Sequence, residues 1–165
     1  MATYRTLKDP RAWLAAVAFV AACFLASGIG QLLGGSPRGE WYRGLAKPTF
    51  TPPSWVFGPA WTALYICMGL AGWLVWLRRG SVAVGAPLAL FAVQLALNAA
   101  WTPLFFGLRS PGLAMIDIVA LWLAILLTAG AFFRVSAAAG WLMLPYLLWV
   151  SFAAALNFSI WRLNA

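Results

Sequence analysis

"PGLAMIDIVALWLAILLTAGAFF", residues 111–133, decides the fold of this chain, because its only ionisable side chain is Asp117. A helix needs roughly 20 predominantly apolar residues to cross the hydrocarbon core of a bilayer. Four more windows of this kind occur, at about residues 12–33, 55–77, 87–108 and 139–163. The windows are continuous and do not alternate as the strands of a membrane barrel do. The sequence therefore predicts an all-α integral membrane protein, a bundle of five transmembrane helices.

The composition agrees with this class. Hydrophobic residues make up 64% of the chain, charged residues make up 8%, and the mean hydropathy is +0.89. Most of the 165 residues lie in the five windows, so we expect one membrane domain over residues 1–165 and no separate soluble domain. The first window is long for a signal peptide and lacks a small-residue cleavage pattern, so we expect it to remain as a helix of the mature protein.

Three of the predicted helices begin with residues that are typical of a helix N-terminus. Asp9 precedes Pro10 and Ser110 precedes Pro111, which places a capping side chain before a proline at the first helical position. Ser54 is expected to cap the second helix in the same way.

The basic residues suggest an orientation. Six lie on the side of the amino terminus and five on the other, but three of those five belong to the loop between the first two helices, expected at 34–54. If this loop folds as a cap, the count becomes six against two, and the positive-inside rule places the amino terminus in the cytoplasm. The net charge of +8 is spread over every loop. We attribute it to topology and contact with lipid headgroups and expect no nucleic-acid partner.

The scarcity of histidine, cysteine and acidic residues limits which catalytic and metal-binding sites the chain can form. The chain has no histidine, two cysteines and three acidic residues, so we expect no metal site and no required cofactor. Cys23 and Cys67 form no CxxC pair and are interpreted as small buried residues. No Ser-His-Asp set, phosphate-binding glycine loop or close carboxylate pair occurs. Asp117 is costly inside lipid, and we interpret it as a carboxyl that hydrogen-bonds a neighbouring helix, with a proton-coupled or ligand-linked role as the alternative.

Aromatic and polar side chains recur at helical spacing on three of the predicted helices. One stripe lies on each helix, and the three consist of Trp61, Tyr65, Met68 and Gly72; Gln94, Asn98, Trp101 and Phe105; and Tyr146, Trp149, Ala153 and Asn157. The simpler interpretation of these three stripes is that they pack in the core of the bundle. Packing between membrane helices favours small residues, however, whereas these stripes mix large rings with amides that need hydrogen-bond partners. The pattern also fits a flat aromatic pocket.

The loop at 34–54 and the helix start after it are rich in proline and aromatic residues. The prolines at 48, 52, 53 and 59 reduce the entropy lost when the loop becomes ordered. Its rings, Trp41, Tyr42, Phe50 and Trp55, would then supply the apolar underside of a lid. The alternative is an aromatic anchor at the membrane interface, which the sequence features by themselves support equally well.

Three segments together resemble one family. "WYRGLAKPTFTPPSWVFGPAWTALYICMG", "NAAWTPLFFG" and "LPYLLWVSFAAALN" resemble the TspO family of tryptophan-rich sensory proteins, which is related to the mitochondrial translocator protein or peripheral benzodiazepine receptor. The resemblance spans about residues 12–164. It implies a five-helix receptor, often dimeric and expected from a bacterial membrane, that binds porphyrins, sterols and isoquinoline or benzodiazepine drugs beneath the loop between the first two helices. It therefore favours the lid interpretation of 34–54.

The resemblance also implies which residues form the site. Trp61 and Trp149 correspond to the pocket tryptophans and Asn98 to a polar contact. The further lining residues would be Trp41, Phe50, Tyr65, Phe105, Tyr146 and Ala153. Two positions depart from the family pattern. Some relatives have two aromatic residues where this chain has Thr49 and Phe50, and Phe158 stands where a sterol-recognition motif has tyrosine.

Three functional classes remain open at this point. They are a sensor or receptor of protoporphyrin-type tetrapyrroles, a transporter of them, and an enzyme that degrades them. The sensor leads, because transport predicts inverted repeats or coupling-ion sites that the sequence lacks. The resemblance supplies the third class, a reaction that depends on light and oxygen and uses Trp61 and Trp149 as candidate catalytic residues.

A homodimer is expected through the third helix. Ala92, Ala96 and Ala100 recur every four residues and allow two helix backbones to approach closely. Asn98 is two positions from Ala96, about 200° around the helix, so this seam points away from the polar stripe. The alternative is that these alanines pack against another helix of the same chain.

Overall fold

The computed structural model describes residues 9–34 and 39–165, and the described part of the chain is helical, with no strand. Five helices are long and apolar enough to cross a membrane, by length and composition. They are α2 (Pro10–Gly34), α4 (Ser54–Trp76), α5 (Gly85–Thr102) continued by the π-helix η1 (Pro103–Gly107), α6 (Pro111–Val135) and α7 (Ala137–Leu163). The predicted five-helix bundle is confirmed. A short helix, α3 (Glu40–Gly44), lies in the first loop and was not predicted.

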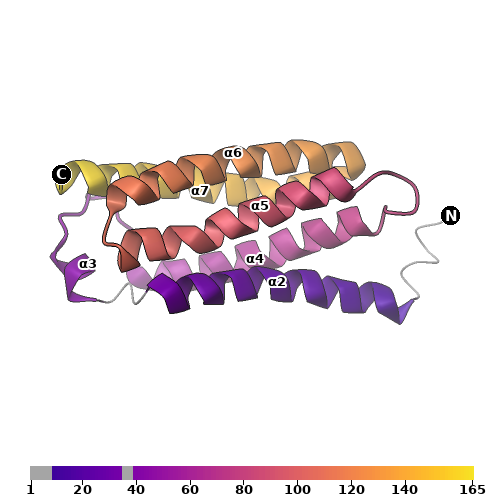
Figure 1. The fold of residues 1–165 in the computed structure, drawn as a ribbon, viewed down its shortest axis with the longest axis horizontal. Helices are drawn as coiled ribbons and strands as arrows, with labels where there is room; N and C mark the ends of the chain where they lie inside the picture. Colours follow the sequence, from indigo (N-terminus) through magenta and orange to yellow (C-terminus); the bar gives the residue numbers. More distant parts are fainter. Residues whose placement is uncertain (1–8, 35–38) are drawn as a thin grey trace.

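The five long helices form a closed ring. In Figure 1 they run side by side along the long axis of the molecule, with α3 and the carboxyl terminus at one end and the start of α2 at the other. Helix α2 packs against α4 and α5, α5 packs against α6, α6 against α7, and α7 against α4. Each helix therefore has one face toward the ring interior and another toward the surroundings.

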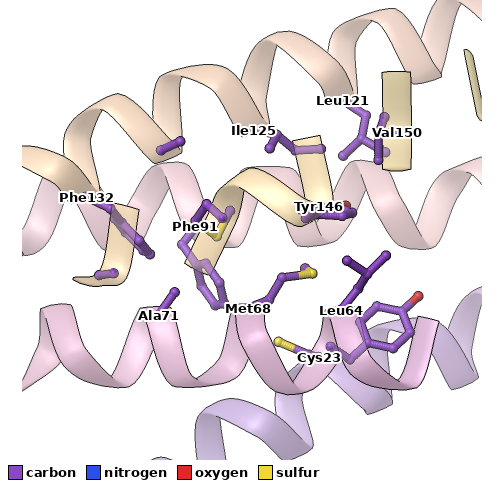
Figure 2. Close-up of a cluster of buried hydrophobic side chains, with 14 of the residues drawn as sticks. Cys23, Leu64, Met68, Ala71, Phe91, Leu121, Ile125, Phe132, Tyr146 and Val150 are labelled. Carbon is purple, nitrogen blue, oxygen red and sulfur yellow. The ribbon is translucent and has the colours of Figure 1, made fainter. Parts of the chain in front are cut away.

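Side chains from all five helices fill the ring interior. Figure 2 shows Cys23, Met68, Phe91, Ile125 and Tyr146 converging from α2, α4, α5, α6 and α7. On the outside the pattern reverses, because large apolar side chains such as Leu32 (87% exposed) and Leu148 (71% exposed) face away from the protein. An apolar outer surface of this extent suits lipid and not water.

Close approach of α2 to its neighbours depends on glycine. A Cβ atom on Gly30 would lie 2.6 Å from the carbonyl oxygen of Ala99, and one on Gly34 would lie 2.6 Å from the carbonyl carbon of Thr102. On the other side, a Cβ on Gly69 of α4 would lie 2.6 Å from the backbone of Val20. Small residues therefore bring the helix backbones together, as expected where lipid tails leave packing as the main attraction between helices.

The predicted helix caps are partly correct. Asp9 Oδ1 accepts a hydrogen bond from the Arg11 backbone N–H, and Ser110 Oγ accepts one from Leu113. The expected cap at Ser54 is wrong, because α4 already begins at Ser54 and Pro53, which has no side-chain donor or acceptor, occupies the capping position. Residues 35–38 of the expected lid, and Arg5, Lys8 and Arg38 of the charge count, lie outside the described residues.

Two prolines of the long helices, Pro103 and Pro145, act differently. Pro103 has no N–H for the helix ladder, and the chain continues from it as a π-turn closed by a hydrogen bond from Leu108 N–H to the Pro103 carbonyl at 2.8 Å. Pro145 lies inside α7, which remains one helix through it. The π-turn projects Phe105 inward, where the side chain is 1% exposed.

Candidate functional site

A chain of hydrogen bonds joins three helices inside the ring. The Tyr65 hydroxyl of α4 donates to Asn98 Oδ1 of α5 at 3.0 Å, and Asn98 Nδ2 donates to the Tyr146 hydroxyl oxygen of α7 at 2.9 Å. All three side chains are buried. We call this group the polar centre. It brings together three of the residues that the sequence singled out.

Aromatic rings surround the polar centre. The Trp61 ring stacks on Tyr65 with centroids 5.3 Å apart, and it meets Tyr146 edge-on at 6.1 Å and Trp149 edge-on at 6.4 Å. Both tryptophans are only partly buried. The rings of Trp61 on α4 and Trp149 on α7 therefore contact each other beside the polar centre and remain partly exposed at the surface of the bundle. Ala153, one turn after Trp149 on α7, packs at the edge of the same cluster.

The segment after α3 reaches this cluster through a row of rings. Phe152 lies 5.8 Å from Trp149, and Phe50 of the loop lies 6.3 Å from Phe152, measured between centroids. Phe50 itself remains 48% exposed. Phe57 also meets Trp149 edge-on at 5.9 Å. Sequence reasoning missed Phe57 and Phe152, although each lies one turn from a predicted tryptophan and the helical period marks both positions.

The remaining predicted residues form a second, adjoining cluster. Trp41 and Tyr42 of α3 meet Phe105 edge-on at 5.8 and 6.2 Å, and Trp101 stacks on Phe105 at 4.9 Å. Trp101 touches both clusters and donates from Nε1 to Asn157 Oδ1 at 3.2 Å. The predicted site residues are therefore divided. Trp41 and Phe105 lie with the α3 cluster and not around the polar centre.

Two expectations about individual side chains need correction. Trp55 is 74% exposed, so it is not part of a buried apolar underside. Asp117 is buried, but its Oδ2 has no hydrogen-bond partner among the described residues, so that oxygen does not make the expected bond to a neighbouring helix. Met68 and Gly72 are buried on α4, and Met68 belongs to the same buried cluster as Tyr65, against which Trp61 packs.

The first loop is attached to the end of α7 by a pair of hydrogen bonds. Asn164 Nδ2 donates to the Ala46 carbonyl at 2.9 Å, and the Ala46 N–H donates to Asn164 Oδ1 at 3.0 Å. Lys47 Nζ donates to the Leu45 carbonyl at 3.1 Å and lies 4.6 Å from the centre of the Tyr42 ring, in a cation–π contact. Burial raises the pKa of Tyr42 above its ordinary value, which keeps the hydroxyl protonated.

A cavity of about 520 Å³ lies beside α3 and not at the polar centre. Trp41 is the only predicted site residue in its lining, which consists of Gly34, Gly39, Glu40, Trp41, Tyr42, Phe106 and Arg109. None of the residues of the polar centre lines this cavity, so the ligand site is assigned to the polar centre and not to it. No group of three metal-ligating side chains occurs within 9–34 and 39–165.

The sequence matches the model of the TspO/MBR family over residues 16–162. The chain belongs to the TspO/MBR family. It is 44% identical over 149 residues to the tryptophan-rich protein TspO of Chlorobaculum tepidum, covering 86% of this chain and 90% of that protein. It is 43% identical over 152 residues to the tryptophan-rich sensory protein of Cereibacter sphaeroides, covering 92% of each chain.

A mammalian relative is about as similar. The human translocator protein is 41% identical over 154 residues, covering 92% of this chain and 91% of that protein. The predicted resemblance to the TspO family is therefore confirmed, and with the five apolar helices it makes the chain an integral, multi-pass membrane protein. Because TspO relatives occur in bacteria and in mammals, the expected bacterial source stays a prediction.

Proposed function

We propose that this TspO-family protein is a membrane receptor that binds a flat tetrapyrrole of the protoporphyrin class around Trp61 and Trp149. The observation that carries the proposal is the placement of these two partly buried rings, on α4 and α7, next to the hydrogen-bonded amide of Asn98. A flat conjugated ligand offers two large apolar faces for such rings and a polar group for the amide. Binding would serve tetrapyrrole sensing or regulation, or transport.

The loop after α3 would act as the lid of this site. Phe50 contacts the cluster through Phe152, and the Asn164–Ala46 pair holds the loop over the same end of the bundle. Sterols and isoquinoline or benzodiazepine compounds are further candidate ligands, on the family resemblance. The relatives' names, translocator protein and tryptophan-rich sensory protein, support a role in handling or sensing a ligand.

Substitution of the two tryptophans tests the proposed protoporphyrin site. Stacking of one ring on an aromatic partner contributes about 1 kcal/mol beyond area burial, which corresponds to about fivefold in affinity. Trp61→Ala and Trp149→Ala should therefore each weaken protoporphyrin binding several-fold, measured by saturable quenching of tryptophan fluorescence. Trp141→Ala is the matched control, because Trp141 is 64% exposed and lies on α7 away from the polar centre. Wild-type affinity in both site variants would refute the assignment.

Light-dependent degradation of the porphyrin is the second candidate, because Trp61 and Trp149 lie in edge-to-face contact with each other at 6.4 Å. In that reaction molecular oxygen would be the oxidant and the tetrapyrrole the group oxidised. We expect illumination of the purified protein with protoporphyrin in air to bleach the Soret band faster in wild type than in Trp149→Phe. Equal bleaching in the two proteins, each at saturating ligand, would eliminate tryptophan-dependent catalysis and leave the receptor.

The partner surface we propose is a second copy of the chain, docked through α5. Ala92 and Ala96 are exposed and Ala100 is partly buried, whereas Asn98 faces the ring interior. The seam therefore lies on the outside of the bundle, as a helix-to-helix contact between two copies requires. Neither a nucleic acid nor a required cofactor enters this proposal.

A further inference from the structure

Gln94 is a buried amide inside the ring, one turn from the polar centre on α5. Its side chain is 0% exposed, and neither Nε2 nor Oε1 has a hydrogen-bond partner among the described residues. Leaving an amide unpaired in an apolar interior is unfavourable, and buried polar groups in native proteins are nearly always paired. A donor and an acceptor are both free here. A group that satisfies Gln94 therefore offers both an acceptor and a donor.

Thr128 of α6 is the polar side chain at the same depth as Gln94. Phe91 stacks on Phe132, and α5 and α6 are neighbours that run in opposite directions. Gln94 comes one turn after Phe91 and Thr128 one turn before Phe132, which brings the two to one level. Thr128 is 0% exposed, and its hydroxyl donates to the Ala124 carbonyl at 2.7 Å. The lone pairs of Thr128 Oγ1 remain available to accept a bond.

The Tyr146 hydroxyl is a second polar group beside Gln94. It accepts a hydrogen bond from Asn98 Nδ2 at 2.9 Å, and its own hydrogen has no acceptor among the described residues. Asn98 lies four residues after Gln94, about 6 Å along the axis of α5. A water molecule that makes a hydrogen bond of about 2.8 Å on either side spans such a distance.

No charged side chain stands at this level of the ring. The spans of α2, α4, α5 and α7 contain no acidic or basic residue, at residues 12–33, 55–76, 85–107 and 137–161. On α6, Asp117 lies 11 residues before Thr128, about 16 Å along the axis. An ion without a countercharge is strongly disfavoured in such an interior. The group that satisfies Gln94 is therefore neutral.

Two methionines line the ring at the level of Gln94. Met68 of α4 and Met143 of α7 are 0% exposed and belong to one buried cluster. Figure 2 shows the Met68 side chain reaching into the interior between Phe91 and Tyr146. Thioethers are unbranched and adapt to irregular gaps, and a buried water needs only about 10–15 Å³ of open volume. The walls at this level can thus accommodate a molecule as small as water.

We propose that Gln94 holds ordered water inside the ring, which links its amide to the Tyr146 hydroxyl and to Thr128. The water accepts hydrogen bonds from Gln94 Nε2 and from the Tyr146 hydroxyl, and it donates to Gln94 Oε1 and Thr128 Oγ1. Water both donates and accepts and carries no charge, as the site requires. The polar centre thus continues one turn deeper into the membrane as a hydration site. This inference does not depend on the ligand proposed at Trp61 and Trp149.

Solid-state magnetic resonance of the ligand-free protein in lipid bilayers tests this hydration. The chain has two glutamines, Gln31 and Gln94, so labelling glutamine and isoleucine with heavy nitrogen gives two side-chain amide signals, and Gln31→Leu identifies them. Magnetisation is transferred from water protons to the labelled nitrogens. The backbone N–H of Ile125 is the dry reference, because Ile125 is 0% exposed on α6. We expect the Gln94 signal to grow several-fold faster than that of Ile125. Growth as slow as that of Ile125 overturns the proposal.

A matched pair of variants tests the link to Tyr146. Tyr146→Phe removes the hydroxyl that bonds the water and should slow the transfer to Gln94 several-fold. Tyr42→Phe makes the same chemical change beside Phe105 and Phe106, in the α3 cluster, and should leave the transfer at the wild-type rate. A transfer to Gln94 that Tyr146→Phe leaves unchanged contradicts the link and overturns the inference. No porphyrin is added, so the result stands apart from the titration that tests the receptor.

Discussion

At the scale of the residue, Asn98 is the side chain on which the polar centre depends. One amide bonds two buried tyrosine hydroxyls, as acceptor for Tyr65 and donor to Tyr146. The pair of bonds ties α4, α5 and α7 together at one level of the ring. An amide provides both functions with one short side chain, whereas an ionised carboxylate only accepts hydrogen bonds.

Replacing Asn98 should therefore lower stability. Asn98→Leu keeps the number of side-chain heavy atoms but removes the bonds to both buried hydroxyls, and each buried group left unpaired destabilises by about 1–3 kcal/mol. We expect a clear fall in the melting temperature of the detergent-solubilised protein. Tyr65→Phe combined with Asn98→Leu should recover part of that loss, because one of the unpaired groups is gone. A single variant that melts like wild type would show that the two bonds contribute nothing.

At the scale of the element, the loop after α3 is held by few but well-placed contacts. Asn164 pairs with both backbone groups of Ala46, much as a neighbouring strand would, and it also donates to the Ile160 carbonyl within α7. The prolines of the loop limit the conformations it has without these bonds. The attachment of the loop therefore depends strongly on one exposed side chain at the end of α7.

Loss of this attachment should expose the loop to protease. Asn164→Ala removes both bonds to Ala46, and we expect trypsin to cleave after Arg43 several-fold faster, followed by mass spectrometry of the fragments. Ser159→Ala is the control on the same helix, since Ser159 bonds only its own helix at Ala155. If the loop is a lid, protoporphyrin should slow cleavage in wild type. Cleavage that Asn164→Ala leaves unchanged would argue against the attachment.

At the scale of the whole molecule, the ring has an inner and an outer face on every helix, and α5 shows the division clearly. Phe91, Gln94 and Asn98 face inward, whereas Ala92 and Ala96 face outward. The same helix can therefore line the ligand site and pair with a second copy without conflict. The two surfaces are separated by the helical period alone.

A bulky side chain on the outer face of α5 should separate the proposed dimer. Ala96→Leu prevents close approach of two helix backbones, so we expect the detergent-solubilised protein to shift toward monomer in light scattering while protoporphyrin affinity stays within about twofold of wild type. Ala63→Leu is the control, because Ala63 is exposed on the outer face of α4. A variant that remains dimeric would refute this interface, and one that loses porphyrin affinity would place the seam in the site.

Much of the fold and part of the site follow from the sequence. Five apolar windows determine five helices, because the bilayer leaves no other way to satisfy that much buried backbone. The helical period also placed Tyr65, Asn98 and Tyr146 on inward faces, since residues three and four apart share one side of a helix. The tryptophan and proline pattern of residues 41–61 was specific enough to indicate the family.

Only the tertiary structure decided which inward faces meet. The sequence put Phe105 and Trp41 in one set with Trp61 and Trp149, but the π-turn at Pro103 and the packing of α3 place them in a separate cluster. The pairing of Ala46 with Asn164 joins positions 118 residues apart, which no local pattern reports. The free amide of Gln94 is likewise invisible in the sequence. Helical periodicity is a local property, whereas partners across a ring depend on the order and depth of all five helices.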